Sequence, residues 1–231
     1  MLENLILLSL PAEERASVVE SSTKVNLPQH SILYRPAQPI EHVYFLESGL
    51  VSLLTAGNDG RAIKTGVVGR EGLVGSTVVL GAPATNGQAI VQIGGHALRV
   101  HASQFLQSYE RLPALTRLVN GHLGLLLFQA RQNALCHALH SIESRFCRWL
   151  LQASDHLETN VLELTQEACS QILGVQRTSV SMVAHSLQLA GIIRTRRGKI
   201  EILDRARLQS AACECYQHLK QRFDTAYLKA A

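Results

Sequence analysis

Short apolar runs separated by glycines dominate residues 25–101. The runs Val43–Leu46, Leu50–Leu54 and Ala89–Ile93 are rich in β-branched and aromatic residues, and most of the glycines fall around them. Many short strands joined by glycine turns favour a small antiparallel barrel or roll. Between two of the runs, Asn58-Asp59-Gly60 has the composition of a hairpin turn.

The apolar pattern becomes helical beyond Ser103. From Ala114 to about Ser154 there is no proline, and the spacing of apolar residues predicts a long helix of at least about six turns. His140–Ser144 is expected to interrupt it and to begin a second domain. One stripe of the long helix follows a 3-4 spacing: Leu115, Leu118, His122, Leu125, Gln129, Gln132, Cys136 and Leu139. Either this stripe packs on the roll of its own chain, or it forms the seam of a dimer. We favour the seam, because a long helix leaving a barrel needs a partner for its second face.

Residues 164–183 read as two short helices joined by a tight turn at Gly174, where a positive φ is often needed. Thr165 can cap the first helix with its hydroxyl. The expected buried residues of the two helices are Ala168, Ile172, Leu173, Val180, Val183 and Leu187. Further on, residues 191–203 read as a strand, a basic turn and a second strand, which together form a wing beside the helical hairpin.

A helix with an arginine and short hydrogen-bonding side chains on its exposed face can lie in a DNA major groove. The expected DNA contacts are Thr165, Gln176, Arg177, Thr178, Ser179, Ser181, Met182, His185, Arg196, Arg197 and Lys199. Arg177 is the candidate for reading guanine, and the wing cations are expected near phosphates. Thr178 and Met182 can contact a thymine methyl, although Met182 can equally pack inside the domain. An ordinary helical hairpin with a solvated face is the alternative.

Charge placement supports the DNA interpretation. The net charge is +4, and residues 160–231 hold ten lysines and arginines against six acidic residues, so the excess lies beside the hairpin.

No apolar run is long enough for a membrane span, and Glu3 in the apolar start favours a short helix over a signal peptide. Five cysteines at irregular spacing predict reduced thiols in a cytoplasmic protein.

The order of these parts resembles the Crp/Fnr family of bacterial transcription regulators. The resemblance rests on residues 42–54 and 69–75 in the roll, on residues 164–180 in the hairpin and on residues 200–206 after the wing. It implies an α+β fold with an antiparallel β-roll of the jelly-roll type (1–112), a long dimerisation helix (113–143) and a winged helix-turn-helix (144–231). It further implies a homodimer on a palindromic operator in double-stranded DNA, with RNA polymerase as a partner.

The family's cyclic AMP site does not carry over. The glutamate that members use for the ribose falls at Ser76, after Gly75, and the arginine for the cyclic phosphate falls at 86–88, where Asn86 and Gln88 flank a glycine. A buried phosphate needs a charged partner, so the sequence predicts no tight cyclic AMP binding. Near the adenine position stands Arg131, which could face another anion but is expected at the surface.

Other cofactors are left open or disfavoured. No cysteine precedes Cys136, so the N-terminal iron–sulfur cluster of one family branch is not expected. Haem sensing stays open, although a structural role is expected for the available histidines, among them His42, His96, His101 and His122. Cys213, Cys215 and His218 supply three metal ligands, one short of a closed zinc site, so no metal is predicted there.

No P-loop, nucleophile elbow or convincing metal set indicates an enzyme, and Glu71 among glycines fits a turn. The alternative function is a ligand-binding or protein-interaction adaptor with a degenerate hairpin. The basic wing and the co-located charge argue against it. The effector, the operator and the direction of regulation stay open, as does the role of Cys213 and Cys215.

Overall fold

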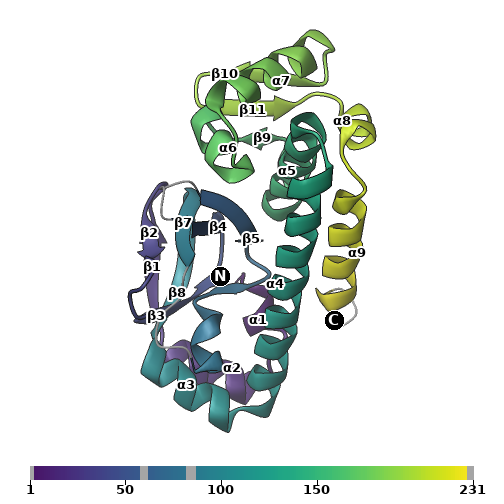
Figure 1. Ribbon diagram of the computed structural model, residues 1–231. Coiled ribbons are helices and arrows are strands. Elements are labelled where there is room, and N and C mark those ends of the chain that lie inside the picture. The colour runs from purple at the N-terminus through teal and green to yellow at the C-terminus, as the bar shows by residue number, and fades with distance from the viewer. Residues whose placement is uncertain (1–2, 58–61, 82–86, 228–231) are drawn as a thin grey trace.

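A β-roll, a long helix and a small α/β domain follow one another along the chain (Figure 1). The computed structural model describes residues 3–57, 62–81 and 87–227. Two short helices, α1 (Leu5–Leu8) and α2 (Ala12–Glu20), precede the roll. α1 is the short helix that the apolar start predicts, whereas α2 was not predicted from the sequence. Over the described residues, no helix is both long and apolar enough to cross a bilayer.

The roll consists of two four-stranded antiparallel sheets, which confirms the predicted fold class. One sheet has the order β1-β8-β3-β6 and the other β2-β7-β4-β5. The strands are β1 (Thr23–Leu27), β2 (Ile32–Tyr34), β3 (His42–Leu46), β4 (Leu50–Ala56), β5 (Ala62–Val68), β6 (Leu73–Val74), β7 (Gly87–Ile93) and β8 (Gly95–His101). β4 and β5 pair antiparallel as far as Ala56 and Ala62. The predicted hairpin turn Asn58-Asp59-Gly60 lies outside the described residues.

From Val43 to Leu46, β3 is apolar and buried because both of its faces are covered. Tyr44 and Leu46 point into the core between the two sheets, whereas Val43 and Phe45 point to the other side, where helices pack. Successive side chains of a strand alternate between faces, so a strand between two cores needs apolar residues at every position.

The helices on that side include α3 (Ala102–Arg111) and the first turns of α4 (Pro113–Leu139). α4 has 27 residues and is therefore about 40 Å long. It begins with Pro113 and has no capping side chain next to it in sequence. Instead, Glu14 of α2 accepts hydrogen bonds from the N–H groups of Ala114 and Leu115 at 3.3 and 3.0 Å. A carboxylate there also complements the positive end of the helix dipole.

The 3-4 stripe of α4 packs on its own chain as far as Cys136, and its last member, Leu139, is 73% exposed. The interpretation of the stripe as a dimer seam is therefore wrong. Leu115 and Leu125 are buried, and the polar members serve the roll. His122 Nε2 lies 2.9 Å from the carbonyl oxygen of Leu73. The Gln129 amide accepts from the N–H of Val67 at 2.8 Å and donates to its carbonyl at 3.0 Å. Polar residues interrupt the stripe because they pair with the backbone of the roll.

α5 (Ile142–Leu157) follows a break at His140, as predicted, and Ser141 caps it by accepting from the N–H of Ser144. Beyond α5 lie β9 (Val161–Leu162), α6 (Gln166–Leu173), α7 (Arg177–Leu189), β10 (Ile193–Arg196), β11 (Lys199–Ile202), α8 (Arg205–Ala211) and α9 (Cys215–Tyr227). The three strands form one sheet in the order β10-β11-β9. α9 packs against α4 and α5, away from the winged part (Figure 1).

The contact between Gln129 and β5 gives a stability prediction. Gln129→Leu keeps the size of the side chain but leaves the N–H and C=O of Val67 buried without a partner. Such groups cost about 1–3 kcal/mol, so we expect the free energy of unfolding to fall by about that much in urea titrations. Gln107→Leu, at an exposed glutamine of the neighbouring helix α3, is the matched control and should change stability by less than about 0.5 kcal/mol. Equal stability of Gln129→Leu and the parent would contradict the role given to this amide.

Candidate nucleic-acid interface

α6 and α7 form the predicted helical hairpin. Thr165 caps α6 by accepting from the N–H of Ala168 at 3.0 Å, and Gly174 follows the helix with φ 64°. The residues expected to be buried are buried or half-buried against the domain core, and Ala184 joins them. A Cβ at Gly174 would also lie 2.8 Å from Cγ2 of Ile63 in β5. The turn therefore needs glycine both for its conformation and for its contact with the roll.

The outer face of α7 presents the predicted side chains to solvent. Arg177 is the first residue of the helix, and Gln176, Thr178 and His185 are exposed beside it. Met182 is 68% exposed, which decides against the alternative of a core methionine. Because the first residues of a recognition helix are the ones that reach base edges, this face has the required layout.

Ser181 departs from the expectation that it faces away from the core. It is half-buried, and its hydroxyl donates to Oε1 of Gln166 at 2.7 Å, which links α7 to α6. Its hydroxyl is therefore engaged within the hairpin. Ser179 is also half-buried, whereas Thr165 is exposed.

The wing is the hairpin of β10 and β11, with Arg196 opposite Lys199. Gly198 has φ 73°, so the tight turn between the strands requires it. Lys199 pairs with Glu163 at 2.8 Å on the surface. Among the described residues, Arg196 and Arg197 have no acidic partner, so their charges are available to an external anion.

A groove of about 530 Å³ separates the hairpin from the wing. Thr165 and Arg177 line one wall, and Arg196, Arg197 and Lys199 line the other. The structure thus brings together DNA-contact candidates that lie about 20 to 30 residues apart in sequence. Four cations and one acidic residue, Glu167, line the groove, and this excess of positive charge attracts a polyanion.

Sequence reasoning missed the residues that hold these parts in place. Gln188, in the last turn of α7, accepts from the N–H of Thr195 at 2.8 Å and so fixes the wing relative to the helix. Gln166 holds Ser181, and Glu163 holds Lys199. No local pattern marks these side chains, because their partners are set by tertiary packing.

The candidate ligand residues of the roll do not gather around a described cavity. Gly75 has φ 91° and precedes the short 3-10 helix η1 (Ser76–Leu80), in which Ser76 is buried. Gln88 is half-buried in β7, and Arg131 is exposed on α4, as expected for a surface arginine. Asn86 lies outside the described residues. Gly75, Ser76, Gln88 and Arg131 line none of three cavities among the described residues: the groove beside the wing, a small hollow beside Glu47 and Arg70, and the cavity between the roll, α5 and α9.

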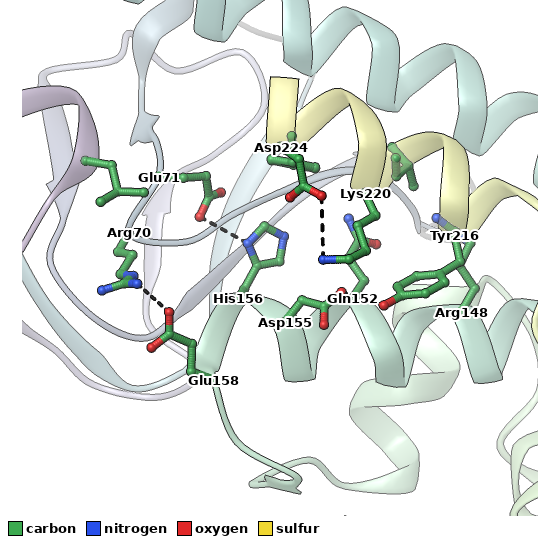
Figure 2. A pocket seen from close by; sticks show the side chains of 13 residues that line it. Arg70, Glu71, Arg148, Gln152, Asp155, His156, Glu158, Tyr216, Lys220 and Asp224 are labelled. Atoms are coloured by element: carbon green, nitrogen blue, oxygen red, sulfur yellow. Dashed lines mark hydrogen bonds and ion pairs between the residues drawn. The ribbon is translucent and has the colours of Figure 1, made fainter. Parts of the chain in front are cut away.

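A cavity of about 210 Å³ lies instead where the roll meets α5 and α9 (Figure 2). Glu71, in the predicted turn, accepts from the N–H of Gly69 at 2.8 Å and lies 3.0 Å from Nδ1 of His156. Burial raises the pKa of Glu71, but His156 and the Gly69 hydrogen bond outweigh burial and lower the pKa below its usual value. Figure 2 also shows Arg70 reaching Glu158 across this boundary. These two contacts join the roll to the C-terminal end of α5.

The histidines considered for haem have structural surroundings. Burial lowers the pKa of His122 to about 4, so the ring is neutral at pH 7 and bonded to Leu73. His42 and His101 lie edge to face on neighbouring strands, with ring centroids 5.4 Å apart, and His101 caps α3. His96 is exposed.

Comparison with solved structures shows the fold. FixK2 from Bradyrhizobium japonicum is 19% identical over 83% of this chain and 98% of its own, with a TM-score of 0.72. A transcriptional regulator of the Crp/Fnr family from Eubacterium rectale is 16% identical over 90% and 99%, with a TM-score of 0.71. The c-di-GMP-responsive global regulator CLP of Xanthomonas campestris is 18% identical over 83% and 99%, with a TM-score of 0.70. Comparison with curated proteins gives no significant match.

Comparison with protein families matches both parts of the molecule. Residues 24–111 match the cyclic nucleotide-binding domain, and residues 144–211 match the Crp-like helix-turn-helix domain. The two matches together span more than half of the chain, in the order that the roll and the winged domain have in the structure. The chain therefore belongs to the Crp/Fnr family of transcription regulators.

Proposed function

We propose that this protein is a homodimeric transcription regulator. Its α7 helices recognise a palindromic DNA operator, and its wings bind the flanking phosphates. The observation that carries the proposal is the groove in which Arg177, Arg196 and Arg197 face solvent without acidic partners among the described residues. Three uncompensated guanidinium groups on one face favour a polyanion. Arg177 reads a base, because it begins the exposed helix, and the wing arginines bind phosphates. RNA polymerase is the partner that the family suggests.

The proposed dimer forms through the outer face of α4, opposite the stripe that packs on the roll. The exposed residues of this face also recur at a 3-4 spacing: Arg117, Asn120, Gly124, Leu127, Arg131, Ala134 and Ala138. Leu127, at the middle of the helix, is 54% exposed. A Cβ at Gly121 or Gly124 would meet no described atom within 4 Å, so a second helix can approach closely. A two-fold dimer would present two α7 helices about one DNA turn, 34 Å, apart.

The roll is proposed to act without tight cyclic AMP binding. At the two described positions that correspond to the ribose and phosphate contacts of the family, Ser76 and Gln88 carry no charge. A phosphate buried in the roll would then lack a charged partner, which costs several kcal/mol. The contacts of Glu71 with His156 and of Arg70 with Glu158 join the roll to the C-terminal end of α5 and offer a route by which another signal could reach the DNA-binding domain.

Arg177→Ala tests base reading. The operator is first selected from random duplexes by the protein itself, and affinity is then measured by fluorescence anisotropy at fixed salt. We expect a loss of about 1–3 kcal/mol on the selected site and a much smaller loss on random DNA. Arg197→Ala is the matched control: it should weaken both by similar factors and lower the salt slope by about one. Equal losses of Arg177→Ala on both DNAs would remove its base-reading role, and no selected sequence at all would favour the adaptor alternative.

Leu127→Glu tests the dimer face. Sedimentation velocity of the parent protein should show a dimer, and the variant should dissociate to a monomer, since a buried carboxylate pair is strongly disfavoured. Leu80→Glu, at another exposed leucine outside α4, should remain dimeric. A monomeric parent protein, or a dimeric Leu127→Glu, would place the interface elsewhere or remove it.

Calorimetry with cyclic AMP tests the proposed sensor. We expect no binding heat at micromolar nucleotide, because the phosphate finds no cation at the family position. A micromolar dissociation constant would show that other residues complete the site and that the prediction is wrong.

A further inference from the structure

Four side chains that can bind a metal gather where α4 ends. Cys136 lies in the last turn of α4, His140 directly follows the helix, and Cys213 and Cys215 flank the start of α9. Their ligand atoms all lie within 4.8 Å of one another. Cys136 Sγ is 3.5 Å from Cys213 Sγ, and Cys215 Sγ is 3.5 Å from His140 Nδ1. The three cysteines form a buried cluster of their own.

These distances fit a tetrahedral metal site. With metal–sulfur bonds of about 2.3 Å and metal–nitrogen bonds of about 2.0–2.1 Å, the edges of the tetrahedron are about 3.5–3.8 Å. The two measured edges have this length, and the widest separation allows closure by small side-chain rotations. Three thiolates and one imidazole form a donor set that structural zinc sites use. The sulfur-rich donor set disfavours magnesium and calcium, which prefer oxygen ligands.

The surroundings of the cluster are those of an oriented ligand set. Glu214 Oε1 lies 3.0 Å from Nε2 of His140, which leaves Nδ1 directed at the thiols. Gln132 Nε2 lies 3.0 Å from Sγ of Cys215 and donates to it. A carboxylate behind a ligating histidine and a donor to a ligating sulfur are the outer contacts that stabilise metal sites.

A divalent cation at this cluster would stabilise the cysteines as thiolates, and their protons would be released to solvent.

Among the described residues, the other cysteines and His218 do not belong to this cluster of metal-binding side chains. Burial raises the pKa of Cys147 and Cys169 to about 12 in the core of the DNA-binding domain. His218, which sequence proximity alone associates with Cys213 and Cys215, is exposed and stands outside the cluster. The third and fourth ligands are instead Cys136 of α4 and His140, which directly follows that helix.

We propose that Cys136, His140, Cys213 and Cys215 bind one zinc ion, which fastens the start of α9 to the end of α4. The DNA-binding domain begins with α5, two residues beyond His140. The ion therefore holds the joint at which the long helix passes to that domain. This site shares no residue with the groove proposed for DNA, so the zinc proposal does not depend on the proposed function.

The test measures metal in the full-length protein. After purification under argon without chelators, elemental analysis should give one zinc per chain. Cobalt(II) added to the zinc-free parent protein should give the intense visible bands of tetrahedral coordination and a sulfur-to-cobalt charge-transfer band. His140→Ala and Cys213→Ser should lose the ion, whereas His218→Ala and Cys147→Ser should retain it. Glu214→Gln should weaken zinc binding about 10–100-fold.

Three results would overturn the proposal. The first is a folded parent protein, judged by circular dichroism, that contains no zinc and gives no tetrahedral cobalt spectrum. The second is full zinc content in both His140→Ala and Cys213→Ser. The third is a Cys136–Cys213 disulfide, found by mass spectrometry in the protein purified under argon. The cobalt spectrum uses the parent protein, so it decides the matter even where a variant does not fold.

Discussion

The open edge of β5 is the constraint on which the rest of the structure depends. β5 ends its sheet, so alternate backbone groups along it have no strand to pair with. α4 supplies amide side chains in place of that strand: Gln129 pairs with both backbone groups of Val67, and Asn133 donates to the carbonyl of Thr65 at 2.9 Å. Buried backbone groups need partners, so these bonds fix where α4 lies along the roll.

The same contact fixes the DNA-binding domain. Oδ1 of Asn133 accepts from Arg148 of α5 at 2.9 Å, so one side chain joins β5, α4 and α5. Lys64 of β5 lies 3.6 Å from the ring centroid of Trp149, and burial, followed by Arg148, lowers the pKa of Lys64 well below its usual value. Leu50 and Val67 of the roll belong to the same apolar cluster as the core of the winged domain. The roll and the DNA-binding domain are therefore packed against each other through one continuous apolar core.

Local sequence patterns predicted a large part of the fold. Glycine-separated apolar runs predicted the roll, and the absence of proline predicted α4. The capping threonine at Thr165 and the positive φ at Gly174 are local properties of the chain, so they were predictable without any partner. The exposed face of α7 followed from helical spacing, since a helix that buries one side leaves the other to solvent. The prediction that Ser181 faces away from the core was wrong, because its hydroxyl donates to Gln166 of the neighbouring helix α6.

The sequence by itself determined the roll, the long helix, the helical hairpin and the wing, their order, and the cations that the hairpin and the wing present, because periodicity and turn chemistry act over a few residues. Only the tertiary structure decided which stripe of α4 packs inward, since amides at Gln129 and Asn133 look polar until β5 lies beside them. Only the tertiary structure brought Cys136 and His140 to Cys213 and Cys215, because ligands from the two ends of a domain share no spacing that a sequence can display.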